Sequence, residues 1–568
     1  MRGEPRGLAV GAGLRLCAIH RSGVVRPTGE YGAHMRQSLA IMLCLSSASA
    51  LAGKGATQIF LDGFEPPPAC AAVAGGGSAT VAAPQLIATL DDSFHESWLA
   101  SPAVADLDGD GTPEILAARS NVLLGWHLDG TIVFRGNVNG SDRIWSSPIV
   151  ADFVPSQPGL EVAVAARSRI YLWNAAAQSQ SGFPHVWRDE MRSIAAGDID
   201  GDGDLELVVA TTQRLEAGGQ RDLLYAVHHD GTPVAGFPPN TTGVAGCTSS
   251  CFVTGGFDQN VALGNVDADP EWEVFAGHDN AYWSLHDGNG RAFDANPVFA
   301  NRDKVSGIRS MHDYALAQQG FPNTPAADNQ AHFTNSAPSF ADVDGDGTRE
   351  LIILGSVQNA SQSDRLRGVG LWVLRPDGTR PPNWLTPYHV PTYLAGLQDF
   401  AGTNIVGATN QVSVADIDTS RAGPEFVFAG FDGRIHAVDA TRSLLWSHAY
   451  TSDARVLTGG VAIGDLSGDG HPEIVFASYS PDANKGQLFV LGPDGTRLHT
   501  LALPDRGAMS VPTLADADAD GTLDIVVNLK DGVSNVRQVQ VYEVPGARDN
   551  CLPWPTGRGN LLRNGNPP

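Results

Sequence analysis

The feature that most constrains this chain of 568 residues is a short acidic segment that recurs along most of its length. Each copy has an apolar stretch, an acidic loop related to D-x-D-x-D-G-x-x-E, and a second apolar stretch, as in AVADLDGDGTPEILAA from Ala103. The first acidic or Asn position of the eight copies lies at residues 106, 152, 198, 265, 342, 416, 465 and 516. Self-similarity of this kind predicts one repeat architecture rather than several unrelated domains.

The length and content of the repeat predict an all-β propeller. The first two intervals, 106–152 and 152–198, each span 46 residues, the size of one four-stranded blade. In the first copy the strands A to D are expected near 103–105, 114–118, 122–127 and 131–135, where β-formers dominate and an Asp-Gly turn separates C from D. A linear solenoid fits less well because helix signals are missing. We expect eight blades, or seven if the degenerate copy at 152 or 416 is absorbed elsewhere.

The two ends of the repeat region predict how the ring closes. Residues 85–107 (QLIATLDDSFHESWLASPAVADL) align with residues 131–153 (TIVFRGNVNGSDRIWSSPIVADF), so 85–91 has the pattern of a D strand with no A, B or C strand before it. The last copy, from Thr513, supplies A, B and C strands but no clear D strand. We therefore expect the N-terminal strand to complete the last blade and close the ring.

The acidic loops predict calcium sites. Positions 1, 3, 5 and 9 offer side-chain oxygens, position 7 a carbonyl, and Gly at position 6 permits a sharp turn, which suits a cation that takes six to eight oxygen ligands. Soft ligands are missing, so zinc and copper are disfavoured. The acid at position 9 and the flanking strands exclude an EF-hand. The candidate ligands are Asp106, Asp108, Asp110, Glu114, Asp198, Asp200, Asp202, Glu206, Asn265, Asp267, Asp269, Glu273, Asp342, Asp344, Asp346, Glu350, Asp465, Ser467, Asp469, Glu473, Asp516, Asp518, Asp520 and Asp524.

Some loops depart from the full pattern. Ser467 replaces a carboxylate with a hydroxyl, and Pro270 stands where Gly is expected. The loops that begin at Asp152 and Asp416 carry an extra residue before Glu161 and Glu425 and lose acidic positions, so we expect those two loops to be free of metal.

This arrangement resembles the FG-GAP/VCBS repeat family, the β-propeller class that includes the head of integrin α subunits. The resemblance covers about residues 85–545 and rests on the A-D-x-D-G-D-G-x-x-E-I loops and on the Gly-Phe-Pro turns at 182–184 and 236–238. It implies structural calcium in the loops between A and B strands. It implies no single function, because the family serves adhesion, lectin-like binding and, in some polysaccharide lyases, catalysis.

The N-terminal segments predict export. Residues 35–52 combine a short basic start, an apolar run and an A-x-A pattern at 50–52, which is typical of a secretory signal peptide. We expect Met35 to be the true start, so that residues 1–34 are not part of the mature protein, and we interpret 53–84 as a linker and 546–568 as a tail near the closure seam. The predicted location is extracellular, periplasmic or the cell surface.

Export would leave four cysteines in an oxidising compartment, an even number that predicts two disulfides. Four cysteines allow three pairings. A local Cys247–Cys251 staple and a Cys70–Cys551 bridge between the chain ends are the pairing we favour.

Charge narrows the choice of partner. The chain has 37 basic and 62 acidic residues, a formal net charge of −25, which disfavours nucleic acid and anionic membranes as partners. No segment after the signal has about 18 uninterrupted apolar residues, so no transmembrane segment is expected.

A candidate ligand face follows from the long insertions. Residues 240–256, 299–337 and 383–410 interrupt connections from D to A strands, and 356–368 interrupts a B–C connection, so all four are expected on the face opposite the acidic loops. Aromatic rings stack on sugars, although they could equally pack the insertions onto the propeller. The candidates are His312, Tyr314, His332, Trp384, Tyr388 and His389, with Trp98, Trp145 and Trp187 in shorter D–A connections.

Two functions remain open. The first is adhesion or carbohydrate recognition of a glycan or protein ligand, which the absence of a separate catalytic domain and of common catalytic motifs favours. The second is a lyase that acts on an acidic polysaccharide, with a His or Tyr base and Arg309 as a neutralising cation. No residue is assigned a catalytic role.

Overall fold

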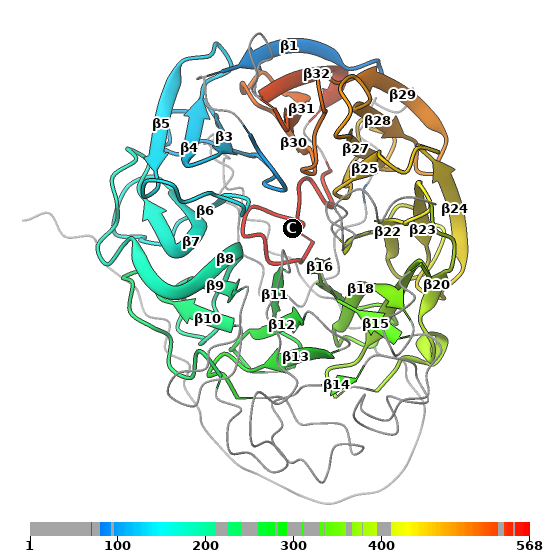
Figure 1. Cartoon of the computed structure of the whole chain (residues 1–568), viewed down its shortest axis with the longest axis horizontal. Helices are drawn as coiled ribbons and strands as arrows, with labels where there is room; N and C mark the ends of the chain where they lie inside the picture. Colours follow the sequence, from blue (N-terminus) through cyan, green and yellow to red (C-terminus); the bar gives the residue numbers. More distant parts are fainter. Residues whose placement is uncertain are drawn as a thin grey trace, which may run out of the picture. The chain divides into compact units, whose positions relative to one another are not determined.

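Apolar B and C strands with both faces buried, and half-exposed D strands, organise this chain into a ring. The structure, a computed structural model, describes residues 70, 80–91, 96–211, 224–239, 260–267, 269–278, 282–291, 309–310, 330–333, 335–358, 366–377, 379–394, 410–531, 539–548 and 551–567. All of them lie within the compact unit Gly55–Pro568. Their strands form seven hydrogen-bonded sheets arranged as a propeller (Figure 1).

The first three sheets take the chain from residue 103 to residue 310. The first contains β2 (Ala103–Ala105), β3 (Glu114–Arg119), β4 (Val122–Trp126) and β5 (Ile132–Asn137). The second contains β6 (Ile149–Ala151), β7 (Glu161–Trp173), β8 (His185–Gly197), β9 (Glu206–Thr211) and β10 (Leu224–Val227). The third contains β11 (Val261–Gly264), β12 (Glu273–Gly277), β13 (Tyr282–His286) and β14 (Arg309–Ser310).

The next three sheets run from residue 330 to residue 502. The fourth contains β15 (Gln330–His332), β17 (Ser339–Ala341), β18 (Glu350–Gln358), β19 (Val369–Leu374) and β20 (Tyr388–Val390), with the short helix η3 (Pro382–Trp384) before β20. The fifth contains β16 (Ser336–Ala337), β21 (Asn410–Ala415), β22 (Glu425–Ala429), β23 (Arg434–Val438) and β24 (Leu444–Ala449). The sixth contains β25 (Leu457–Thr458), β26 (Ala462–Gly464), β27 (Glu473–Tyr479), β28 (Gln487–Leu491) and β29 (Arg497–Ala502).

The seventh sheet joins the two ends of the repeat region. Its order is β1 (Gln85–Leu90), β32 (Val539–Arg548), β31 (Thr522–Asn528) and β30 (Thr513–Ala515). β1 pairs antiparallel with β32, from Gln85 opposite Glu543 to Leu90 opposite Val539. The closure expected from the sequence is confirmed: the N-terminal strand supplies the outer strand of the last sheet.

Eight repeats occupy seven sheets because the second sheet carries two of them. β7 pairs with β6 through residues 161–163 and with β8 through residues 167–170, and β8 pairs with β9 through residues 191–197. The acidic loops at 152 and 198 therefore belong to one hydrogen-bonded sheet. Of the two blade counts expected, the seven sheets match the smaller, and the all-β propeller is confirmed.

Burial follows the position of each strand within its sheet. β3, β4, β9 and β22 are buried along their whole length, and they read as nearly continuous apolar runs. The outer strand β5 alternates between exposed and buried side chains, and β29 is mostly half-buried or exposed. The apolar cores lie between neighbouring sheets, where inner strands such as β21 and β27 pack together.

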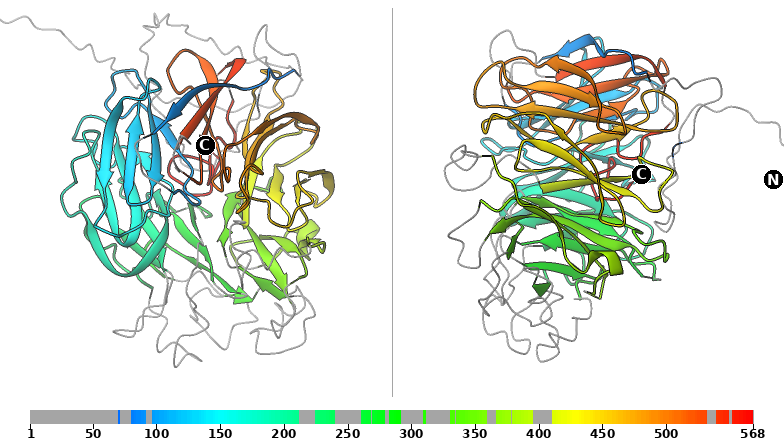
Figure 2. Two further views of the ribbon diagram at one scale, coloured as in Figure 1. Left: turned by 45° about the horizontal axis from the view of Figure 1, so that its top comes forward. Right: turned by 90° about the vertical axis from the view of Figure 1, so that its right-hand side faces the viewer.

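The C-terminal tail, 551–567, lies at the centre of the ring, as the trace that ends at the label C shows in Figure 1 and in the two turned views of Figure 2. Its main chain forms hydrogen bonds of 2.8–3.2 Å with six A strands. In chain order Trp554 contacts β26, Pro555 β30, Leu561 β6, Leu562 β8, Asn564 β11 and Gly565 β17. Trp554 is fully buried, so the tail is part of the core rather than an appendage.

A disulfide fixes the start of this tail. Cys70 and Cys551 are joined, with Cα atoms 5.6 Å apart, as the sequence predicts. The second predicted pair, Cys247–Cys251, lies outside the described residues. Because the Cys70–Cys551 bridge spans 481 residues, its loss frees nearly the whole chain in the unfolded state.

Removal of the Cys70–Cys551 bridge is expected to lower stability. The variant Cys551→Ala should lose about 2–4 kcal/mol of unfolding free energy, because the unfolded chain regains loop entropy. Denaturant unfolding measures this loss. Cys70→Ala and the double variant serve as controls and should show the same loss, since the bond is one unit. A double variant that loses the sum of two single losses would contradict the bridge.

Candidate metal centres

A buried carboxylate at or near the start of the B strand bonds to every acidic loop; it stands at position 9, or at position 10 in the two loops with an extra residue, and we call it the position-9 carboxylate throughout. In all eight repeats it accepts the backbone N–H of loop position 2, at 2.8–3.0 Å, as Glu114 does from Leu107. These carboxylates are at most 4% exposed. The eight are Glu114, Glu161, Glu206, Glu273, Glu350, Glu425, Glu473 and Asp524. The contact ties the start of each B strand to the end of its A strand, whether or not the loop has other acids.

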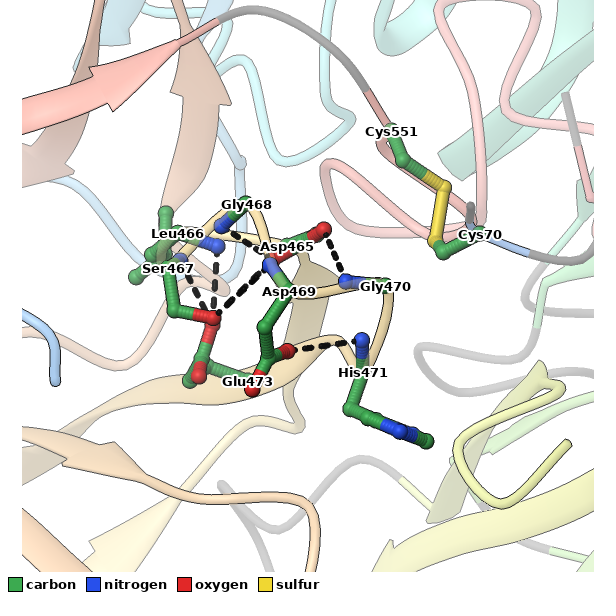
Figure 3. The surroundings of a disulfide bond; sticks show 10 residues. All are labelled: Cys70, Asp465, Leu466, Ser467, Gly468, Asp469, Gly470, His471, Glu473 and Cys551. Atoms are coloured by element: carbon green, nitrogen blue, oxygen red, sulfur yellow. Dashed lines mark hydrogen bonds between the residues drawn. A yellow bond between two sulfur atoms is a disulfide. The ribbon is translucent and has the colours of Figure 1, made fainter. Parts of the chain in front are cut away.

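The carboxylate at position 1 organises the turn. In five loops one of its oxygens accepts the N–H of Gly at position 6, at 2.8–3.0 Å, as Asp106 does from Gly111. Gly109 and Gly111 have φ values of +78° and +90°, which glycine adopts without strain. Figure 3 shows the same arrangement in the loop of Asp465, next to the Cys70–Cys551 disulfide. Asp465 N–H also donates to the carbonyl of Cys551, so this loop contacts the tail.

Pro270 explains why one loop begins with Asn rather than Asp. Proline has no N–H, so position 6 of this loop cannot donate to an acceptor at position 1. Asn265 Nδ2 instead donates to the carbonyl of Asp269, at 2.5 Å. The amide supplies the donor that the loop backbone lacks.

Carboxylates gather in at least four of the six loops where the sequence predicts metal. Potential ligand atoms lie within 4.8 Å of one another in each set. The sets are Asp106, Asp108 and Asp110; Asp198, Asp200 and Asp202; Asp267, Asp269 and Glu273; and Asp342, Asp344 and Glu350. Hard oxygen ligands at this density fit a divalent cation such as calcium.

Burial and crowding raise the pKa of the position-9 carboxylates. The pKa of Glu206 is raised to about 9, and those of Glu273, Glu350 and Glu473 to about 8, because burial disfavours the charged form and the neighbouring Asp residues repel it. Glu273 and Glu350 each keep a buried Oε1 without a hydrogen-bond partner. A bound cation would accept that oxygen and stabilise the charged form.

A second set of residues, missed from the sequence, faces the position-9 carboxylates from the ends of C strands. His127 Nε2 lies 2.9 Å from Glu114 Oε1, and His228 Nδ1 lies 3.2 Å from Glu206 Oε1. Arg375 donates to Asp344 at 2.6 Å and lies 3.7 Å from Glu350. Each of the three stands two residues before an Asp-Gly dipeptide in the sequence. This fixed spacing is the sequence signal that could have identified them. A cation in the Asp342 loop would have to compete with Arg375.

The two degenerate loops contain substitutes for a metal. In the loop of Asp416, Arg421 donates to Asp418 and to Asp439, both at 2.9 Å, and so places a guanidinium among the acids. In the loop of Asp152, Gln180 Nε2 donates to Glu161 Oε1 at 3.1 Å. That these two loops are free of metal stays a prediction.

Three of the six residues predicted to bind a ligand lie in the core or in a strand of the fourth sheet. Trp384 is 1% exposed, donates from Nε1 to the carbonyl of Ala440 and has no ring face open to a ligand. Tyr388 and His389 lie in β20, the outer strand of the fourth sheet, rather than in an insertion. Tyr388 packs edge-on against Phe428, and His389 Nε2 lies 2.7 Å from the carbonyl of Arg367.

Of the other three candidate ligand residues, one lies in a strand and two lie outside the residues that the structure describes. His332 lies in β15, which pairs with β18. His312 and Tyr314 lie outside the described residues. The prediction is wrong for Trp384, which is buried in the core, and the other five residues stay candidates without a common cluster among the contacts of the described residues.

Two of the three tryptophans predicted in short D–A connections meet, whereas the prediction is wrong for Trp187, which lies within β8 because that strand extends from His185 to Gly197. Trp98 and Trp145 stack with ring centres 5.4 Å apart. Lys530 Nζ lies 3.5 Å from the ring centre of Trp98, and the Arg192 guanidinium lies 4.4 Å from that of Trp145. Trp187 stacks separately on Tyr225, with centres 3.5 Å apart. Cations therefore cover both outer faces of the Trp98–Trp145 stack.

The hydrogen bond from the loop backbone to the position-9 carboxylate, which we call the clasp, is expected to stabilise a loop that holds no metal. Glu161→Ala should lower the free energy of unfolding by about 2–4 kcal/mol, because the buried N–H groups of Phe153 and Val154 lose their acceptor. Glu161→Gln, which keeps an acceptor oxygen, is the control and should lose much less. Denaturant unfolding with calcium and with EDTA measures both variants. A loss that disappears in EDTA would mean that Glu161 acts through a metal.

Comparisons with known proteins agree with the fold. The FG-GAP-like repeat matches residues 465–527, and the FG-GAP repeat matches residues 192–222. A search of curated proteins found no relative of this chain. The described residues contain no helix that is long and apolar enough to cross a membrane.

Several solved structures match most of this chain at low sequence identity. The biofilm matrix protein Bap1 of V. cholerae is 14% identical, with 86% of this chain and 96% of that chain covered and a TM-score of 0.37. The rhamnogalacturonan lyase of Bacillus licheniformis is 13% identical, with coverage of 81% and 75% and a TM-score of 0.41. The C-terminal WD40 domain of Sif2 is 11% identical, with coverage of 83% and 100% and a TM-score of 0.43. Such similarities carry no functional argument. By its two matched segments and its ring of sheets, this chain is a β-propeller that contains FG-GAP repeats.

Proposed function

We propose that this protein is an exported, calcium-stabilised propeller that binds a glycan without converting it. The observation that carries the proposal is the chemical difference between the two ends of the A strands. Acidic loops follow the A strands, whereas the stacked Trp98–Trp145 pair precedes them. A rigid ring with ions at one end and aromatic side chains at the other is suited to recognition.

Calcium in this proposal has a structural role. The loops that begin at Asp106, Asp198, Asp342, Asp465 and Asp516 would hold it through their carboxylates, with Ser467 as a hydroxyl ligand, and the Asn265 loop would use Asp267, Asp269 and Glu273. The ion supplies positive charge that offsets carboxylate repulsion and joins the A and B strands. A site with a Kd near 10⁻⁴ M in about 1 mM calcium adds about 1.4 kcal/mol of stability.

Export is supported by the disulfide and by the signal-like segment 35–52. The Cys70–Cys551 bridge joins two segments that no other covalent link holds together. Bonds of this kind persist in oxidising compartments and are rare in the cytosol.

Binding is favoured over catalysis because the described candidate residues already have packing or hydrogen-bond partners within the protein. Trp384 is a core residue, Tyr388 packs on Phe428, and His389 bonds to a backbone carbonyl. A lyase needs a base that is free to accept a substrate proton. A lyase acting on an acidic polysaccharide remains the alternative that the assay below distinguishes, because His312 and Tyr314 lie outside the described residues.

Chelation of calcium is expected to lower the melting temperature by about 5 °C or more, because several sites of about 1.4 kcal/mol each are lost. A variant with Asp106→Asn, Asp108→Asn and Asp110→Asn should bind one calcium fewer, measured by equilibrium dialysis with elemental analysis. Asp418→Asn is the matched control, since Arg421 already neutralises that loop, and it should bind as much calcium as the wild type. An identical melt with EDTA and no bound calcium would refute the metal assignment.

The glycan proposal is tested with the calcium-loaded protein and a panel of acidic and neutral polysaccharides. Retention of protein on at least one polysaccharide, with no rise in ultraviolet absorbance from unsaturated uronate, is the expected result. A rise in absorbance would replace the proposal with the lyase. Retention on none would reject glycan recognition.

A further inference from the structure

A small pocket lies where the connections into the A strands meet the central tail. Its cavity volume is about 40 Å³, room for about three water molecules or one carboxylate group. Residues that precede A strands line it, including Ser101, Trp145, Asn260 and Met509, together with Gln411 at the start of β21. Gly557 and Arg558 of the tail complete the lining. Because these residues come before the A strands and the acidic loops come after them, the pocket lies at the end opposite the acidic loops.

Arg558 is a buried cation without enough acceptors. Its side chain is 4% exposed, and Nη2 donates to the carbonyl of Val261 at 2.8 Å. Nε and Nη1 are buried and have no hydrogen-bond partner among the described residues. These two nitrogens carry three N–H donors. An unpaired buried charge of this kind costs several kcal/mol unless a ligand compensates it.

Arg563, five residues later in the same tail, shows how this ring satisfies an arginine that has only a structural role. Its Nε donates to Pro148, its Nη1 to Thr556 and Gly557, and its Nη2 to Pro102, at 2.7–3.0 Å. Every nitrogen of Arg563 has an acceptor, whereas two nitrogens of Arg558 have none. The difference leaves Arg558 as a cation of the pocket lining whose charge the described residues do not balance.

The charges around the pocket favour an anion. Burial lowers the pKa of Arg558 to about 9, so the guanidinium remains charged at neutral pH. No carboxylate forms an ion pair with Arg558 among the described residues. On another side of the pocket, Arg192 stacks on Trp145, and its Nε is 3.1 Å from Glu190 Oε1. Asn260, Gln411 and Ser101 add polar groups that can bond to an oxyanion.

We propose that this axial pocket binds the carboxylate of an acidic sugar, with Arg558 as the residue that neutralises it and Trp145 at its border. The inference rests on the proposed glycan-binding function and deepens it by naming the charged group that is recognised. The pocket admits the carboxylate, and the sugar ring remains outside it. A protein with a net charge of −25 would thus take an acidic ligand through one local cation.

The test is calorimetric titration of the calcium-loaded protein with galacturonate, with its neutral methyl ester and with acetate. The wild type is expected to bind galacturonate and to bind the ester at least tenfold more weakly. Arg558→Gln should weaken galacturonate binding at least tenfold. Arg497→Gln, an exposed arginine on β29, is the matched control and should bind like the wild type. Equal binding of acid and ester, or unchanged binding by Arg558→Gln, would overturn the proposal.

A second variant keeps the test valid if Arg558→Gln does not fold. Gln411→Glu places a carboxylate in the pocket beside Arg558 and should also weaken galacturonate binding at least tenfold, with a melting temperature close to that of the wild type. A folded Gln411→Glu protein that binds galacturonate normally would reject the pocket. Acetate that binds as tightly as galacturonate would support the anion site but reject the sugar as its ligand.

Failure of this inference can be separated from failure of the proposed function. Retention on neutral polysaccharides without galacturonate binding would leave glycan recognition intact and reject the carboxylate pocket. Galacturonate binding that Arg558→Gln abolishes, together with retention on no polysaccharide, would keep the pocket and reject glycan recognition.

Discussion

The ring of this propeller depends on the pairing of strands from opposite ends of the chain. β1 must pair with β32, because otherwise the seventh sheet would have three strands and no outer strand from the other end of the chain. The Cys70–Cys551 bond holds the segments that flank this pairing, and the tail that begins at Cys551 then runs through the centre. Contacts between residues hundreds of positions apart therefore decide whether the repeats form one molecule.

The tail and the position-9 clasps stabilise the ring in complementary ways. The tail joins neighbouring repeats, since its main chain bonds to six A strands in succession. The clasps act inside each repeat, since a carboxylate at the start of the B strand bonds to the backbone after the A strand. The clasp is present even where Arg421 or Gln180 stands in place of further acids. The buried acid is thus a structural element of the repeat, and metal binding is an additional use of the same residue.

The two ends of the A strands differ in charge and in chemistry. After the A strands, crowded carboxylates have raised pKa values, because burial and like charges disfavour ionisation. Before them, Arg558, Arg192 and Lys530 lie beside aromatic rings or a small cavity. A chain with an excess of acid therefore has local positive charge at its axis, which the net charge alone does not reveal.

Composition, spacing and turn residues determined much of this architecture: the all-β propeller, the eight loops, the closing strand and the Cys70–Cys551 pair. These features are local or repeat with a fixed register, so they can be recognised without coordinates. Trp384 shows the limit, because an aromatic residue in an apparent insertion is in fact buried against Phe426. Only the tertiary structure decided that two repeats share the second sheet, that Arg375 faces the Asp342 loop, and that Arg558 lies unsatisfied at the axis. Each of these depends on distances between residues far apart in the chain, which side-chain packing sets and sequence pattern does not encode.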